Sequence, residues 1–200
     1  MATNLICYTS SMNIGLCGGH RTGKTTLAEA VAQRAGMPFV KTSTSEVFKG
    51  HALDPSKPMD FKQRLWIQNR ILDTANELWH AEQRQFITDR TPLDMAAYTL
   101  ADVQGATEVN FLELEGYLAR CFEATNRLFR VLVLIQPGIP LMHEAGKAAL
   151  NEGYLEHLNY LILGLCNDDR IKSRFIFISR NVTALEDRIN LVLNGLEAWL

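Results

Sequence analysis

Apolar residues along this chain recur in two patterns: short continuous runs, and longer stretches with helical spacing. The short runs predict buried strands, because a strand covered on both faces needs apolar residues throughout. The longer stretches place apolar side chains three or four positions apart, which predicts helices with one buried face. The predicted strands are 13–17, 38–42, 85–88, 130–136 and 174–179. The predicted helices are 24–35, 60–82, 92–103, 108–125, 141–166 and 183–198.

Strands and helices alternate along the chain without an internal repeat. This alternation predicts an α/β protein, a three-layer sandwich in which helices cover both faces of a parallel sheet of about five strands. The 200 residues are 47% hydrophobic, which suits a single domain over 1–200. Residues 1–11 precede the first apolar run and are interpreted as a loose N-terminal extension. Residues 51–60 contain two prolines and predict an exposed loop.

Charge and cysteine content exclude several classes of protein. The formal net charge is −2, so the composition gives no sign of the broad basic surface of a non-specific nucleic-acid binder. The four cysteines are scattered and are interpreted as reduced structural thiols. No apolar run approaches the length of a membrane span, and the first residues lack the pattern of a secretory leader. We expect a cytoplasmic protein with no membrane partner.

The clearest chemical signal is the stretch Gly-Gly-His-Arg-Thr-Gly-Lys-Thr, which matches the phosphate-binding pattern G-x-x-x-x-G-K-[ST]. Its glycines let the backbone curl so that N–H groups point at phosphates. The stretch lies between a predicted strand and a predicted helix, whose N-terminus favours anions. We interpret it as a site for ATP with Mg²⁺. The predicted binding residues are Gly18, Gly19, His20, Arg21, Thr22, Gly23, Lys24, Thr25 and Thr26.

A second polar element follows the strand predicted at 85–88. Asp89 ends that strand and is predicted to hold Mg²⁺ together with Thr25, while the alternative role is to cap the helix opened by Pro92. Motor ATPases usually place a glutamate after this aspartate to activate water, but here Arg90 follows it. A cation beside the transferred phosphoryl group suits transfer between two substrates. No N-K-x-D guanine signature occurs, so the pattern favours a kinase over a hydrolase.

The helix predicted at 60–82 offers candidate residues for a second substrate. Its apolar stripe consists of Phe61, Leu65, Leu72, Ala75 and Trp79. Gln68 lies on this stripe and Arg64 borders it. A buried, unpaired amide costs on the order of 1–3 kcal/mol, so Gln68 needs partners. It either bonds to nearby backbone or reads the edge of a base, with Arg64 on a phosphate or sugar oxygen.

Two further residues are weaker candidates for the reaction. Glu46 follows the second predicted strand and is a candidate general base, with Asp89 as the rival and a solvated surface glutamate as the alternative. Kinases of this architecture carry a lid in the stretch that follows Gln136-Pro137-Gly138. Lys147 is the candidate lid cation there, or else an ordinary surface charge.

Three segments together resemble a family of small P-loop kinases. They are residues 18–26, residues 86–94 with Tyr98, and Glu186-Asp187-Arg188 in the last predicted helix. The family includes the ribosylnicotinamide kinase domain and phage enzymes that phosphorylate 5-hydroxymethyluracil within DNA, and the resemblance spans most of 12–198. It implies ATP-dependent transfer of the γ-phosphate to a hydroxyl of a pyrimidine nucleotide. The favoured acceptor is 5-hydroxymethyluracil in phage DNA, and the implied location is then the host cytoplasm.

Two alternatives to this function stay open on the sequence. One is a kinase for free deoxynucleoside monophosphates or nucleosides, and the other is a nucleotide-gated switch that is not an enzyme. For the kinase, Lys24 is expected to hold the phosphates, while Arg90 stabilises charge in the transition state. The acceptor, the general base and the oligomeric state are not fixed by the sequence.

Overall fold

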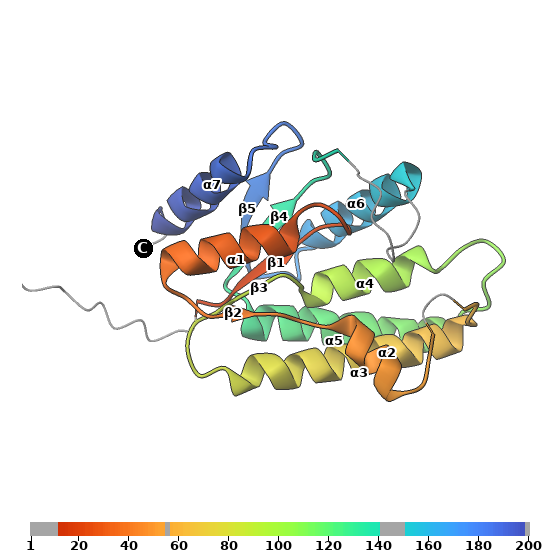
Figure 1. Cartoon of the computed structure of the whole chain (residues 1–200). Coiled ribbons are helices and arrows are strands. Elements are labelled where there is room, and N and C mark those ends of the chain that lie inside the picture. The colour runs from red at the N-terminus through yellow and green to blue at the C-terminus, as the bar shows by residue number, and fades with distance from the viewer. Residues whose placement is uncertain (1–11, 55–56, 141–150, 199–200) are drawn as a thin grey trace, which may run out of the picture.

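The computed structural model describes residues 12–54, 57–140 and 151–198, and its centre is one parallel sheet (Figure 1). The strands are β1 (Ile14–Cys17), β2 (Phe39–Val40), β3 (Ile87–Thr88), β4 (Val131–Ile135) and β5 (Arg174–Ile178). Their order in the sheet is β2-β3-β1-β4-β5, and every neighbouring pair is parallel. The prediction of a five-stranded parallel sheet is confirmed.

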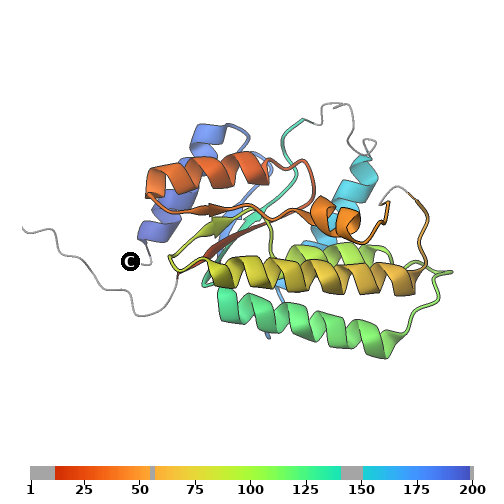
Figure 2. The ribbon, with the colours of Figure 1, turned by 60° about the horizontal axis from the view of Figure 1, so that its bottom comes forward.

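Helices cover both faces of this sheet, so the predicted three-layer arrangement is also confirmed. Figures 1 and 2 show α1 and α7 on one side and α3, α4, α5 and α6 on the other. The helices are α1 (Lys24–Ala35), α2 (Thr44–Gly50), α3 (Phe61–Ala81), α4 (Pro92–Ala101), α5 (Phe111–Leu128), α6 (Glu152–Cys166) and α7 (Leu185–Glu197). Across the described residues, no helix combines the length and the apolar character that crossing a membrane requires.

Two hydrophobic cores lie on opposite faces of the sheet, as side-chain alternation along a strand requires. Leu16 belongs to the core beneath α1 and α7, whereas the next residue, Cys17, belongs to the larger core beneath α3 to α6. All five residues of β4 are buried, which accounts for its uninterrupted apolar sequence. The stripe predicted on α3 is buried in the larger core from Phe61 to Trp79.

Several element bounds differ from the predictions. Residues 44–50 form α2, a helix that we did not predict, and it occupies part of the stretch expected to be a connection. Strand β2 is only two residues long rather than 38–42. Helix α5 starts three residues later than predicted, because the side chain of Asn110 accepts from the N–H groups of Leu112 and Glu113 and caps it there. Of the predicted helix 141–166, residues 152–166 are helical, and 141–150 lie outside the described residues.

The order of the strands determines where the candidate chemistry gathers. β1 and β3 are neighbours in register, with Gly15 opposite Thr88, and the phosphate loop and Asp89 follow directly after these two strands. Both segments therefore leave the sheet at the same edge. In parallel α/β sheets, ligands bind at this carboxyl edge of the strands.

Candidate active site

The phosphate loop links β1 to α1 in a strained, compact path. Arg21 and Gly23 both have left-handed backbone, with φ of 60° and 81°. At Gly18 a Cβ atom would lie 2.6 Å from the carbonyl oxygen of Ile135 on β4, so only glycine fits between the strands. Thr22 adds an internal contact, because its hydroxyl donates to the carbonyl of Gly19 at 2.9 Å. These features hold the loop in a compact shape from within.

The side chain of Lys24 is folded back into this loop. Its Nζ donates to the carbonyl oxygens of Gly18 and Gly19, at 2.7 Å each, and the residue is only 8% exposed. Burial lowers the pKa of Lys24, and Arg90 adds to this effect, whereas Asp94 and Asp89 oppose it. The ammonium is therefore held among loop groups at the place where the loop would meet phosphates.

The last helix supports the loop from behind. Arg188 on α7 is buried, and its Nη1 donates to the carbonyl of Thr22 at 2.8 Å while its Nε donates to Val182 at 2.6 Å. Desolvation lowers the pKa of this guanidinium. On the same helix, Glu186 pairs with Arg34 of α1 through both carboxylate oxygens. This accounts for the Glu-Asp-Arg segment noted in the sequence: two of its three residues tie α7 to the phosphate loop and to α1.

Asp94, on the first turn of α4, is a site residue that our sequence analysis did not single out. It is fully buried, and its Oδ1 accepts from the backbone N–H of Gly18 at 2.8 Å. Its Oδ2 accepts from the N–H of Thr91 at 3.1 Å, as one half of a capping box that opens α4. Burial raises the pKa of Asp94, while Lys24 and Arg90 lower it. One carboxylate thus joins the loop to α4 across 76 positions of sequence.

Thr25 and Asp89, the two residues predicted to hold Mg²⁺, are in direct contact. The Thr25 hydroxyl donates to Asp89 Oδ2 at 2.5 Å, and Asp89 Oδ1 is buried with no hydrogen-bond partner among the described residues. A free carboxylate oxygen beside a hydroxyl at a phosphate loop fits Mg²⁺, which keeps several waters and takes phosphate oxygens as further ligands. Across the described part of the chain, no group of three His, Cys, Asp or Glu side chains could form a self-contained metal cage.

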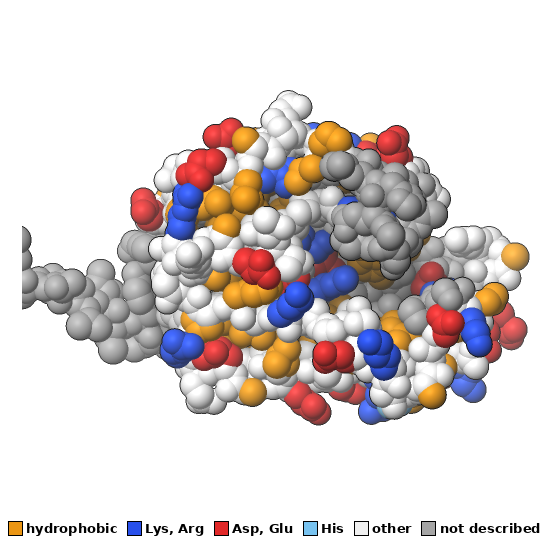
Figure 3. All heavy atoms as spheres, viewed as in Figure 1, with side chains coloured by type: hydrophobic (Ala, Val, Ile, Leu, Met, Phe, Trp, Pro, Cys, Tyr) orange, Lys and Arg blue, Asp and Glu red, His pale blue; other side chains and the backbone are white. Residues whose placement is uncertain are grey.

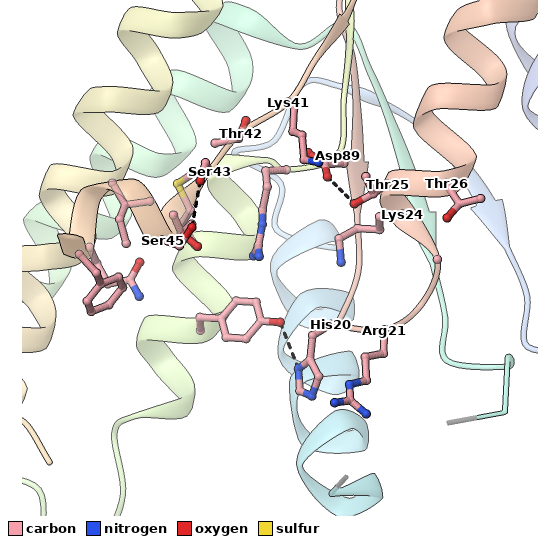
Figure 4. Close-up of a pocket in the computed structure, with 18 of the residues that line it drawn as sticks. His20, Arg21, Lys24, Thr25, Thr26, Lys41, Thr42, Ser43, Ser45 and Asp89 are labelled. Carbon is pink, nitrogen blue, oxygen red and sulfur yellow. Dashed lines mark hydrogen bonds between the residues drawn. The ribbon is translucent and has the colours of Figure 1, made fainter. Parts of the chain in front are cut away.

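A cavity of about 1080 Å³ opens in front of the loop. Figure 3 shows Lys and Arg side chains gathered between α1 and α2 on one face of the molecule. In Figure 4, Lys24, Thr25 and Asp89 lie on one side of the cavity and Ser43 and Ser45 on the other. The lining residues are His20, Arg21, Gly23, Lys24, Thr25, Thr26, Lys41, Thr42, Ser43, Thr44, Ser45, Phe48, Gln68, Ile71, Asp89, Arg90, Met95, Tyr98, Ile139, Pro140 and Tyr154.

Of the residues predicted to bind the acceptor, taken together with the candidate base Glu46, one lines the cavity, two do not, and one is outside the described residues. Gln68 lines the cavity and is half-buried on α3, with Phe48 of α2 and Ile71 in the same wall. Arg64 does not line it, because its guanidinium turns to Asp102 at the end of α4, with 3.6 Å between Nη1 and Oδ2. Glu46 is exposed on α2 and is also absent from the lining. Lys147 lies outside the described residues.

Arg90 and two aromatic side chains, Tyr98 and His20, form a further part of the cavity lining. The guanidinium carbon of Arg90 lies 5.8 Å from the centre of the Tyr98 ring, within reach of a cation–π contact. The Tyr98 hydroxyl lies 3.3 Å from Nδ1 of His20 in the phosphate loop, the dashed contact at the lower centre of Figure 4. Desolvation raises the pKa of Tyr98 to about 12, so this phenol is neutral at physiological pH.

Comparison with protein-family models identifies the family of this chain. Residues 13–131, more than half of the sequence, match the model described as an AAA domain, and the chain belongs to that family. The matched region contains the phosphate loop, Asp89 and Asp94. A search of curated proteins found no match.

Solved structures with this fold include two kinases and NadR. Deoxyadenosine kinase from M. mycoides superposes with a TM-score of 0.68 at 16% identity, covering 94% of this chain and all of that one. Thymidylate kinase from Ehrlichia chaffeensis gives 0.62 at 12% identity, with coverage of 94% and 99%. NadR in complex with NR gives 0.57 at 17% identity, with coverage of 92% and 49%. At these identities the likeness establishes the fold, which is the P-loop kinase fold that the sequence resemblance implied.

Proposed function

We propose that this protein is an ATP-dependent phosphotransferase that moves the γ-phosphoryl group of ATP to a hydroxyl of a nucleoside or nucleotide. The observation that carries the proposal is the continuous cavity that runs from Lys24 and Thr25 to Gln68 and Phe48. A hydrolase needs room for water only, whereas this space on the far side of the phosphate loop is large enough for a second organic substrate.

In this proposal, residues of the loop side bind the donor. Lys24 and the loop N–H groups hold the phosphates, while Thr25 and Asp89 hold Mg²⁺, which neutralises charge on the phosphates when bound. Arg90 lines the cavity and directly follows Asp89 in the chain, and we propose that its guanidinium meets the charge that grows on the transferring group. A cation here, in place of a glutamate that would activate water, favours transfer over hydrolysis.

On the acceptor side, Gln68 is the candidate that reads a base. Its half-buried amide lies in a wall with Phe48, Ile71 and Met95, so the base would pack on apolar surface while the amide bonds to its edge. The finer proposal, drawn from the sequence resemblance, is a pyrimidine nucleotide, with 5-hydroxymethyluracil in DNA as the acceptor. Arg64 would act only if its side chain left Asp102.

A kinase for a free nucleoside or deoxynucleoside monophosphate is the second candidate. The cavity of about 1080 Å³ suits two small substrates without a duplex. The fold is also shared with deoxyadenosine kinase, which has been solved with dCMP and a flexible dCDP bound.

The test is an acceptor panel with ATP labelled in the γ-phosphate. It compares DNA containing 5-hydroxymethyluracil, unmodified DNA, free deoxynucleosides and their monophosphates, each at low and high salt. A DNA acceptor predicts activity that falls steeply with salt through phosphate contacts, and a free acceptor predicts a shallow response. Transfer to none of these acceptors, with ATP still bound, would contradict the kinase proposal and leave the nucleotide-gated switch.

A further inference from the structure

The proposed transfer needs a group that accepts the proton of the attacking hydroxyl, and few described residues qualify. Amines, guanidines and phenols are residue types that ordinarily donate rather than accept protons in such a reaction. This sets aside the basic and phenolic side chains that line the cavity, which are Lys24, Lys41, Arg21, Arg90, Tyr98 and Tyr154. Glu46, the base considered from the sequence, is exposed and outside the lining. Only Asp89 and His20 remain among the described lining residues as proton acceptors.

Asp89 is already committed to another task. One carboxylate oxygen accepts from the Thr25 hydroxyl at 2.5 Å, and the other is the buried, unpartnered oxygen that fits a metal. With one oxygen engaged by Thr25 and the other proposed to hold the metal, Asp89 is not free to take the proton of the acceptor hydroxyl. His20 is therefore the remaining candidate for the general base among the described lining residues.

His20 lines the cavity from the phosphate loop and is flanked by two tyrosine rings. Its Nδ1 lies 3.3 Å from the Tyr98 hydroxyl, and the rings of Tyr98 and Tyr154 lie with centroids 6.4 Å and 5.9 Å from the imidazole. These aromatic rings restrict the imidazole, while the contact at Nδ1 selects which ring nitrogen faces other partners. Asp94, one turn before Tyr98 on α4, fixes the loop backbone at Gly18, so α4 holds the loop at two points.

We propose that His20 is the general base of the transfer and that Tyr98 is its positioning residue. In the assigned tautomer, Nδ1–H donates to the Tyr98 hydroxyl oxygen, which leaves a lone pair on Nε2. Nε2 accepts the proton of the acceptor hydroxyl as that oxygen bonds to the γ-phosphorus. The bond from this phosphorus to the bridging oxygen of ADP breaks, and ADP leaves with the electron pair. The imidazolium then returns its proton to solvent. The assignment rests on the proposed function.

The electrostatic surroundings keep this imidazole neutral. Desolvation, followed by the charges of Lys24, Arg21 and Arg90, lowers the pKa of His20 below its usual value of 6.5. The other described ionisable groups beside it are the phenols of Tyr98 and Tyr154, and burial raises the pKa of both. At pH 7 the lone pair is therefore available, and activity is expected to fall only as the pH drops below 6.5.

The experiment compares variants of His20 with wild type on whichever acceptor the panel identifies. His20→Asn keeps an amide near Nδ1, and His20→Gln places an amide near Nε2, but neither can accept a proton. Both should lose about 100-fold in kcat. ATP affinity by calorimetry should stay within twofold of wild type, because the loop is expected to bind phosphates at position 20 through the backbone N–H and not the side chain. His20→Ala should be partly rescued by added imidazole. His157→Asn is the matched control, since this exposed histidine on α6 does not line the cavity, and it should behave as wild type.

Tyr98→Phe tests whether the Tyr98 hydroxyl positions the His20 imidazole or whether Tyr98 contributes only to packing. It should lower kcat about tenfold and move the acid limb of the pH profile, whereas His20→Asn should remove that limb. Nitrogen NMR of the wild-type imidazole gives a readout without turnover, with Nδ1 protonated at pH 7 as the expected result. Protonation at Nε2 instead, or full kcat in His20→Gln, would overturn the assignment while leaving the kinase proposal intact. A wild-type protein that transfers to no acceptor would overturn both.

Discussion

Replacing Asp94 tests how strongly its carboxylate holds the phosphate loop in its compact shape. Asp94→Ala removes the acceptor of the Gly18 N–H at 2.8 Å and one half of the α4 capping box. A buried donor left unpaired costs about 1–3 kcal/mol, and the lost cap contact costs about 1 kcal/mol. We therefore expect the free energy of unfolding to fall by about 2–4 kcal/mol. In this variant, ATP binding must itself order the loop. The free energy that this ordering costs should lower ATP affinity about tenfold.

Asp94→Asn refines this expectation. Both oxygens of the carboxylate accept hydrogen bonds, from Gly18 and from Thr91, and an amide has only one oxygen. The asparagine variant should thus lose about 1–2 kcal/mol, between wild type and alanine.

Urea unfolding measures the stability of each variant, and calorimetry measures ATP binding. Asp102→Ala is the matched control, because it removes an aspartate at the other end of α4 whose partly exposed ion pair with Arg64 contributes at most about 1 kcal/mol. An Asp94→Ala protein whose unfolding free energy lies within about 0.5 kcal/mol of wild type would refute the argument that this carboxylate braces the loop.

Three other changes address the chemistry directly. Arg90→Ala should lower kcat by about 100-fold and leave ATP affinity nearly unchanged, because the charge that Arg90 meets grows only in the transition state. An unchanged kcat with a raised KM for ATP would make Arg90 a binding residue. Asp89→Asn should abolish most activity and raise the Mg²⁺ concentration for half-maximal rate, and identical metal titrations would argue against its role. Gln68→Leu should lower kcat/KM for the acceptor by the equivalent of about 1–3 kcal/mol of lost interaction free energy, while ATP binding and stability are retained. Unaltered acceptor kinetics would remove Gln68 from the site.

The position of the candidate phosphate loop could be predicted because its pattern is local in sequence. The loop, the strand before it and the helix after it are adjacent, so one stretch of residues contains both the pattern and its structural context. Asp89 was also predictable, because a polar residue at the end of a buried strand projects from the carboxyl edge of a parallel sheet. The resulting Thr25–Asp89 contact spans 64 positions but needed only the right order of strands.

The rest of the site depends on contacts that sequence spacing does not reveal. No local pattern marks Asp94, because its contact with the loop exists only where α4 packs against Gly18. Helix α2 is seven residues long and begins in a run of Ser and Thr, so its helical pattern is weak. In this helix the side chain of Glu46 is exposed and lies outside the cavity lining. Arg64 borders the predicted face of α3, yet the end of α4 supplies Asp102 as a partner that no periodicity could indicate.

The most direct test of the central claim follows the γ-phosphate itself. Wild type and Lys24→Ala are incubated with ATP labelled in the γ-phosphate, with and without the preferred acceptor, and the label is traced. The account predicts label on the acceptor with wild type, little release of inorganic phosphate without acceptor, and less than about a tenth of that rate with Lys24→Ala, since a phosphate clamp supplies several kcal/mol to the transition state. Label released as inorganic phosphate at the same rate with or without acceptor, or full transfer by Lys24→Ala, would contradict it.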